Sequence, residues 1–190
     1  MTRRVVLVIP DAGPLISLGR ADALDLLLRL DLPIYIVDQV RHEATRDSLR
    51  FPDANRINDF IRDNQSVVHE FATEVGRMAA AARESGERAR QRGLGEAAIA
   101  EFLARLDEVV AAPDDPVMLL FEDSDLRRSR FVLPQNVHVV STMALLLGMQ
   151  ERGLIQSAAE VWQKIAATGR HPFEQQAEVP AVTSAGRSSW

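Results

Sequence analysis

The chain has 190 residues and 46% hydrophobic content, which is enough for one substantial core and argues against a second independent domain. It contains no cysteine, which excludes disulfides, thiol catalysis and zinc sites built on thiolates. The net charge of -5 argues against a protein that coats nucleic acid nonspecifically, because such binding depends on neutralised phosphates, but it leaves a nuclease open.

The sequence indicates neither a signal peptide nor a membrane segment. The apolar stretch that follows Arg3 and Arg4 ends at Pro10 without a small-residue cleavage pattern, so we interpret it as a first strand. No run reaches the roughly 18 apolar residues that a membrane helix requires. Together with the absence of cysteine, this predicts a soluble, cytoplasmic protein that does not bind membranes.

Apolar runs alternate with helical periodicity along the first half of the chain. The pattern predicts a strand at 5–10, a helix at 12–30 broken around Gly19, a strand at 33–37, a helix at 39–46, a helix at 52–64 and at best a short edge strand at 67–69. Asp38 is well placed to cap the helix at 39–46.

The second half continues the alternation. It predicts helices at 72–92 and 96–111, a strand at 117–121, a helix at 126–131, a strand at 137–140, and helices at 142–152 and 155–167. The charged segment 83–92 has little apolar face and is expected to be a mobile arm, and residues 169–190 are expected to form a flexible tail after a domain of residues 1–168. Alternating strands and helices predict an α/β protein, a three-layer α/β/α sandwich with a mainly parallel central sheet.

Acidic residues follow two of the apolar runs. Asp11 ends the first run, and Glu122, Asp123 and Asp125 follow the run at 117–121. In parallel sheets ligands bind beyond the carboxyl ends of the strands, so we expect these carboxylates to converge. Crowded like charges raise each other's pKa, which suggests a bound cation. Because the four histidines have no HxxxH spacing, the metal would rest on carboxylates, which suits Mg²⁺ or Mn²⁺.

Each acid also has a structural interpretation. Asp11 is equally well placed to cap a helix. Glu96 borders the apolar stripe of its helix rather than open water, although a glutamate in a first turn is also favoured by the helix dipole. Glu43 alone is more typical of a solvated surface acid, and either Asp123 or Asp125 is expected to cap the helix that follows while the other serves the site.

Four motifs in order resemble the PIN-domain nucleases, a family that includes the VapC-type toxins. They are Asp-Ala-Gly-Pro-Leu-Ile at 11–16, Val-Arg-His-Glu at 40–43, Gly-Leu-Gly-Glu at 93–96 and Leu-Phe-Glu-Asp-Ser-Asp at 120–125. The stretch from Val-Val-Ser-Thr at 139–142 to Gly-Leu-Ile at 153–155 is similar to a subgroup of that family. Each motif alone is weak, but their order makes the signal fairly specific. The resemblance covers about residues 5–167.

The resemblance implies Mg²⁺- or Mn²⁺-dependent hydrolysis of RNA by an acidic cluster. Its catalytic residues would be Asp11, Glu43, Glu96 and Asp123, and its metal ligands Asp11, Glu96 and Asp123, with Asp125 as a further candidate. Glu96 stands where many members have aspartate. Members often form homodimers, and the toxins among them are blocked by an antitoxin protein.

Arginines follow the second acidic cluster. Arg127, Arg128 and Arg130 are candidates for binding substrate phosphates, although a solvated helix face would explain each of them singly. The alternative to a nuclease is a non-catalytic PIN-like module that binds nucleic acid or serves in assembly. Geometry separates the two, because a nuclease requires Asp11, Glu96 and Asp123 to lie close enough to share an ion.

Overall fold

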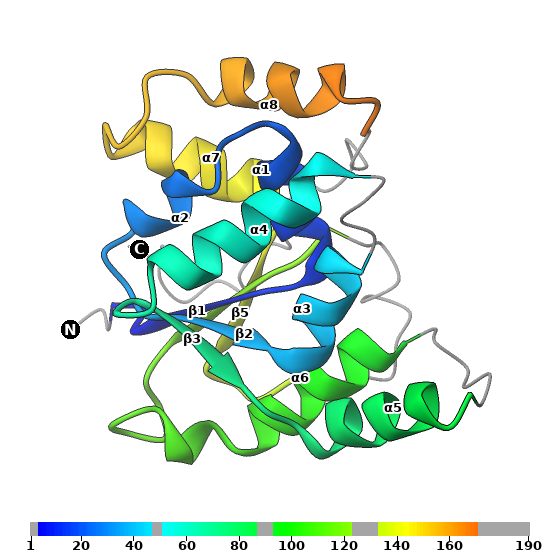
Figure 1. Ribbon diagram of the computed structural model, residues 1–190. Helices are drawn as coiled ribbons and strands as arrows, with labels where there is room; N and C mark the ends of the chain where they lie inside the picture. The colour runs from blue at the N-terminus through cyan, green and yellow to red at the C-terminus, as the bar shows by residue number, and fades with distance from the viewer. Residues whose placement is uncertain (1–3, 47–50, 87–92, 123–132, 171–190) are drawn as a thin grey trace.

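The computed structural model describes residues 4–46, 51–86, 93–122 and 133–170. Its centre is a five-stranded sheet in the order β3-β2-β1-β4-β5, with every pair of neighbours parallel (Figure 1). The strands are β1 Leu7–Pro10, β2 Ile34–Val37, β3 Val68–Phe71, β4 Val117–Leu120 and β5 Val137–Val140. The predicted α/β class and its parallel sheet are therefore confirmed.

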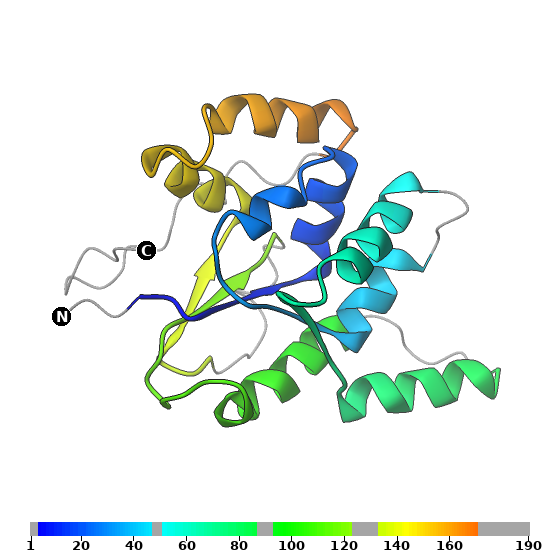
Figure 2. The ribbon, with the colours of Figure 1, turned by 60° about the vertical axis from the view of Figure 1, so that its left-hand side comes forward.

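Helices cover both faces of this sheet. They are α1 Ala12–Arg20, α2 Asp25–Leu28, α3 Asp38–Thr45, α4 Pro52–Asp63, α5 Glu74–Glu84, α6 Leu94–Ala104, α7 Thr142–Glu151 and α8 Ala158–Ala167, with a 3₁₀ turn at Leu106–Glu108. Figures 1 and 2 show α1 and α7 on one side of the sheet and α6 on the other, which gives three layers. All residues of β1 and β4 are buried, as expected for continuous apolar runs in the centre of a parallel sheet.

Several predicted boundaries differ from the structure. The helix predicted at 12–30 is two helices, separated by a turn in which Asp22 has a positive φ of 54°. The helix predicted at 96–111 begins at Leu94, ends at Ala104 and gives way to the 3₁₀ turn. The cap predicted for α3 is wrong, because Asp38 is the first helical residue and Val37 takes the capping position.

Other predictions fall on residues outside the described ranges. These are the helix at 126–131, the end of the charged arm at 87–92, and the tail from 171 onward. Within the described ranges, no helix combines the length and the apolar character needed to cross a membrane.

The strand order marks the carboxyl edge of the sheet as the expected place for a ligand. From β1 the chain adds β2 and then β3 on one side, and later adds β4 and β5 on the other. The direction of winding therefore reverses between β1 and β4. In open α/β sheets, ligands bind at the carboxyl ends of the strands that flank such a reversal.

Candidate functional site

Asp11 lies at this reversal point. It directly follows β1, and its N–H donates to the carbonyl oxygen of Leu120 at 2.9 Å, so the backbone is fixed against β4. Although Asp11 occupies the capping position of α1, its side chain makes no capping hydrogen bond. The third helical residue is Pro14, which has no N–H to offer. The N–H groups of Ala12 and Gly13 in the first turn of α1 still lower the pKa of Asp11, so the carboxylate interacts with the start of this helix without forming a full capping hydrogen bond.

Burial raises the pKa of Asp11 from its ordinary 3.8 to about 7. The negative charges of Glu96 and Glu43 raise the pKa further, while the N–H groups of Ala12 and Gly13 lower it. Three of the four predicted acidic residues, which come from the end of β1, from α3 and from α6, thus lie close enough to repel one another. Their charges interact, but among the described residues they do not form a group that could hold a metal ion.

Glu43 is held in place by its neighbours rather than solvated. Its Oε1 accepts hydrogen bonds from the Gly95 N–H at 3.0 Å and from Nε2 of Gln39 at 3.2 Å. Burial raises the pKa of Glu43 and the charge of Glu96 adds to this, whereas the two hydrogen bonds and the charge of Arg46 lower it. A Cβ on Gly95 would lie 2.8 Å from Oε2 of Glu43, so the glycine allows α6 to approach this carboxylate closely.

Glu96 lies in the first turn of α6, which begins after Gly93 in a left-handed conformation with φ +79°. The buried face of α6, including Ile99 and Phe102, orients this turn toward the site. Within the described part of the chain, no hydrogen bond or ion pair holds the Glu96 carboxylate. It is the least constrained of the three acids.

The described residues do not complete a metal site. Among them, no group of three or more histidine, aspartate or glutamate side chains is arranged to hold a metal ion. The remaining predicted ligands, Asp123 and Asp125, lie outside the described ranges, as do the candidate phosphate-binding residues Arg127, Arg128 and Arg130. Their roles stay predictions.

Glu122 has a role that sequence reasoning missed. The sequence marked it only as one of the acids after the second run, but the structure buries it with three side-chain donors. Ser17 Oγ donates to Oε2 at 2.7 Å, Thr142 Oγ1 donates to Oε1 at 2.6 Å, and Arg170 Nη2 donates to Oε2 at 3.1 Å. These four residues are called the Glu122 network below. A serine inside the apolar face of α1 is the one sequence signal for it.

The Glu122 network ties several segments together beside the acids. Arg170 also donates from Nε to Ser17 Oγ at 2.6 Å and from Nη2 to the Gly13 carbonyl oxygen at 3.2 Å. A Cβ on Gly13 would lie 3.0 Å from Cβ of Glu122, so the first turn of α1 packs directly on this side chain. The contacts of the domain therefore extend to Arg170, two residues past the predicted boundary at 168.

Comparisons with known proteins assign no family. No protein-family model matches the sequence, and searches of curated proteins and of solved structures find no significant match. The resemblance to PIN-domain nucleases therefore depends on the four motifs, and the function must be argued from the geometry of the acids.

Proposed function

We propose that this protein is a metal-dependent endoribonuclease that hydrolyses phosphodiester bonds in RNA through its acidic cluster. The observation that carries the proposal is the convergence of Asp11, Glu43 and Glu96 at the reversal point of the sheet, with the pKa of Asp11 raised to about 7. Strongly perturbed carboxylates at such a position are typical of functional sites.

The donor set suits a hard divalent cation. All three side chains offer carboxylate oxygens, and none of them forms an ion pair with a cation in the described part of the chain. Asp11 and Glu96 would hold Mg²⁺ or Mn²⁺, together with Asp123 and the further candidate Asp125 from the sequence. Such an ion supplies stabilisation of the negative charge that develops on the phosphate and lowers the pKa of the attacking water.

Glu43 would accept the proton of that water. Its hydrogen bonds from Gly95 and Gln39 fix its carboxylate in one place, and burial raises its pKa, which makes the carboxylate a better proton acceptor.

The resemblance adds partners to this proposal. RNA is the substrate, and the toxin form of the proposal adds an antitoxin protein, a second copy of the chain and a cytoplasmic location. Light scattering during size-exclusion chromatography tests the homodimer directly. A monomer would remove the homodimer from the proposal without affecting the nuclease activity.

One observation favours a second function. Because no three metal-ligating side chains among the described residues are arranged around an ion, a non-catalytic PIN-like module that binds nucleic acid or serves in assembly is the alternative. Such a module would bind RNA or a partner protein without cleaving RNA.

Cleavage of single-stranded RNA with Mg²⁺, with Mn²⁺ and with a chelator separates the two functions. We expect cleavage only with metal, and a loss of at least 100-fold in Asp11→Asn, because removal of a catalytic group commonly costs that much. Asp25→Asn is the matched control, since Asp25 is exposed on α2 and pairs with Arg29. RNA binding without cleavage under all conditions would support the alternative.

A further inference from the structure

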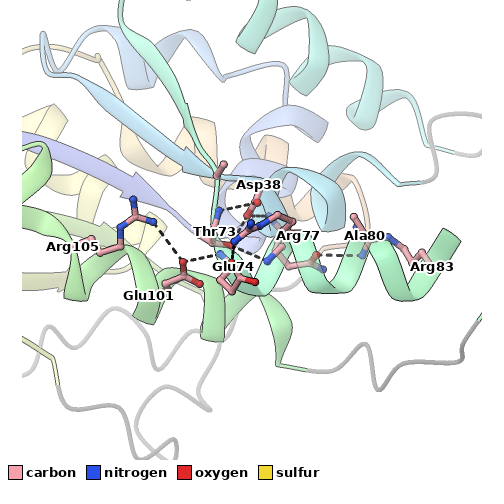
Figure 3. Close-up of a pocket in the computed structure, with 11 residues that line it drawn as sticks. Asp38, Thr73, Glu74, Arg77, Ala80, Arg83, Glu101 and Arg105 are labelled. Atoms are coloured by element: carbon pink, nitrogen blue, oxygen red, sulfur yellow. Dashed lines mark hydrogen bonds and ion pairs between the residues drawn. The ribbon is translucent and has the colours of Figure 1, made fainter. Parts of the chain in front are cut away.

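A pocket lined by charged, polar and small residues opens along the carboxyl edge of the sheet (Figure 3). Its volume is about 430 Å³, within the range of ligand sites. Asp38 and Gln39 follow β2, and Ala72 and Thr73 follow β3, so the pocket lies at the carboxyl ends of these two strands. Because β2 is the neighbour of β1 and β3 is the next strand, the pocket lies one to two strands from Asp11. Adjacent strands are about 4.8 Å apart. Its remaining lining comes from α5, α6 and the turn after α6.

Two of the acids in the pocket are committed to backbone donors. Asp38 accepts hydrogen bonds from the Thr73 N–H at 2.9 Å and from Thr73 Oγ1 at 2.7 Å, and also from the Gln39 N–H at 2.8 Å. Glu101 accepts from the N–H groups of Glu74 at 2.7 Å and Val75 at 3.0 Å. These carboxylates fix the start of α5 and leave little negative charge without a partner.

The three arginines of the pocket differ in their partners. Arg77 pairs with Glu74, and Arg105 donates twice to Glu108, at 2.6 and 2.8 Å. Arg83 donates only to the neutral side chain of Gln39, at 3.3 Å, and forms no ion pair with a described residue. A guanidinium has five N–H donors, so Arg83 keeps donors for an anion.

Gln39 links this arginine to the acidic cluster. Its side chain is buried, with 2% exposed, and it bridges two functional groups. Its Oε1 accepts from Arg83, and its Nε2 donates to Glu43 Oε1 at 3.2 Å. Arg83 is therefore positioned relative to Glu43 through one buried amide. The positive charges of Arg83 and Arg46 also lower the pKa of His42, after the larger effect of burial, so cations gather on this side of α3.

We propose that this pocket binds the nucleotide of a single-stranded RNA next to the scissile phosphate, and that Arg83 holds the phosphate of that nucleotide. The inference rests on the proposed function and names a subsite for its substrate. An RNA strand that lies along the carboxyl edge of the sheet would reach from the acidic cluster to the pocket. The fork of a guanidinium matches phosphate oxygens, and the carboxylate and hydroxyl oxygens of the lining offer acceptors to a base or ribose.

The test compares Arg83→Gln with Arg62→Gln, both measured with a fluorescent eight-nucleotide RNA. Arg62 is exposed on α4 and pairs with Asp59 and Asp63, so the control removes the same charge far from the pocket. Binding is measured by anisotropy in the Asp11→Asn background, which prevents cleavage. We expect Arg83→Gln to weaken binding about tenfold and to reduce the salt dependence by the equivalent of one phosphate contact, while Arg62→Gln changes neither.

Kinetics in the otherwise wild-type protein give a second readout. Arg83→Gln should raise KM about tenfold with kcat nearly unchanged, and Arg83→Lys should recover part of the loss, because a point charge still attracts phosphate. Equal RNA affinities for Arg83→Gln and Arg62→Gln would overturn the subsite and leave the nuclease standing. RNA that binds through Arg83 but is never cleaved would overturn the nuclease alone, and a wild-type protein that binds no RNA would overturn both.

Discussion

Two carboxylates follow neighbouring strands at the same edge of the sheet, yet their surroundings are opposite. Glu122, after β4, accepts hydrogen bonds from two hydroxyls and a guanidinium. Asp11, after β1, is partly buried beside Glu43 and Glu96, and its pKa is raised to about 7. A position at the end of a strand therefore does not decide what an acid does. Its partners decide it.

The energetic consequences also differ. Burial of a charge costs several kcal/mol, and hydrogen bonds and an opposite charge offset much of that cost for Glu122. Asp11 bears the cost of burial and the repulsion of two acids without a cation among the described residues. Folding alone gives no reason to place an acid there. A ligand that carries positive charge gives such a reason. We therefore interpret the Glu122 network as the structural support, and Asp11 with Glu43 and Glu96 as the ligand site.

The largest expected effect is the loss of stability when the Glu122 network is disrupted. Glu122→Ala removes the acceptor shared by Ser17, Thr142 and Arg170, and should lower the free energy of unfolding by about 3 kcal/mol, measured by urea denaturation. Glu151→Ala, at the exposed end of α7, should stay within about 0.5 kcal/mol of the wild type. Equal effects of the two substitutions would mean that the Glu122 network does not stabilise the fold.

Asp11→Asn should raise the stability of the metal-free protein, whereas Glu122→Ala lowers it, and the size of the gain should depend on pH. Because the pKa of Asp11 is about 7 in the folded protein and 3.8 ordinarily, the folded state retains a proton that the unfolded state releases. This contribution to stability is fully present below about pH 4 and is lost as pH rises through 7. Metal-free Asp11→Asn should therefore match the wild type near pH 4 and become more stable than it as pH rises toward 8.

Thermal unfolding of both proteins across this pH range, with and without Mg²⁺, measures the effect. Added Mg²⁺ should stabilise the wild type above pH 7 and have little effect on Asp11→Asn, because binding to the folded state stabilises it. A variant that is less stable than the wild type at pH 8 would contradict the prediction and give Asp11 a structural role.

The sequence was sufficient for the centre of the fold for a physical reason. Strands such as β1 and β4 are buried on both faces, so their sequences are continuous apolar runs with few alternative interpretations. Helix ends were predicted less well. The turn at Asp22 and the early end of α6 depend on local backbone conformation and tertiary packing, which periodicity does not encode.

The residues of the candidate site also differ in how far the sequence alone identified them. Asp11 and Glu96 were marked by their places at a strand end and at the edge of an apolar stripe, whereas Glu43 came only from the resemblance to a family. The Glu122 network escaped prediction because Ser17 and Glu122 are 105 residues apart in the sequence. Arg170 follows the last helix, in a segment with no periodic pattern to place it against α1.

A smaller loss of stability is expected when Arg170, the cation that pairs with Glu122, is replaced. Arg170→Gln leaves Ser17 and Thr142 as donors to Glu122, so we expect a loss of about 1–2 kcal/mol in urea denaturation, less than for Glu122→Ala. Arg62→Gln, which breaks only exposed pairs on α4, should change stability by no more than about 0.5 kcal/mol. If Arg170→Gln loses no more stability than this control, then Arg170 does not contribute to the stability of the Glu122 network.

The smallest change in stability should come with a clear change in activity, at Gly95. A Cβ at this position would lie 2.8 Å from Oε2 of Glu43, the far end of a flexible side chain, so alanine should displace the carboxylate rather than the backbone. The lost hydrogen bond from the Gly95 N–H costs about 1 kcal/mol, and the better helix propensity of alanine offsets about as much. We therefore expect the free energy of unfolding of Gly95→Ala to lie within about 0.5 kcal/mol of the wild type, and the variant to cleave RNA at least about tenfold more slowly.

A double-mutant cycle with Glu43→Ala identifies the cause, because a residue that acts through Glu43 adds no further loss of activity once that carboxylate is gone. If the two losses multiply instead, Gly95 acts on another group of the site, and the role of Glu43 as the base must be reassigned.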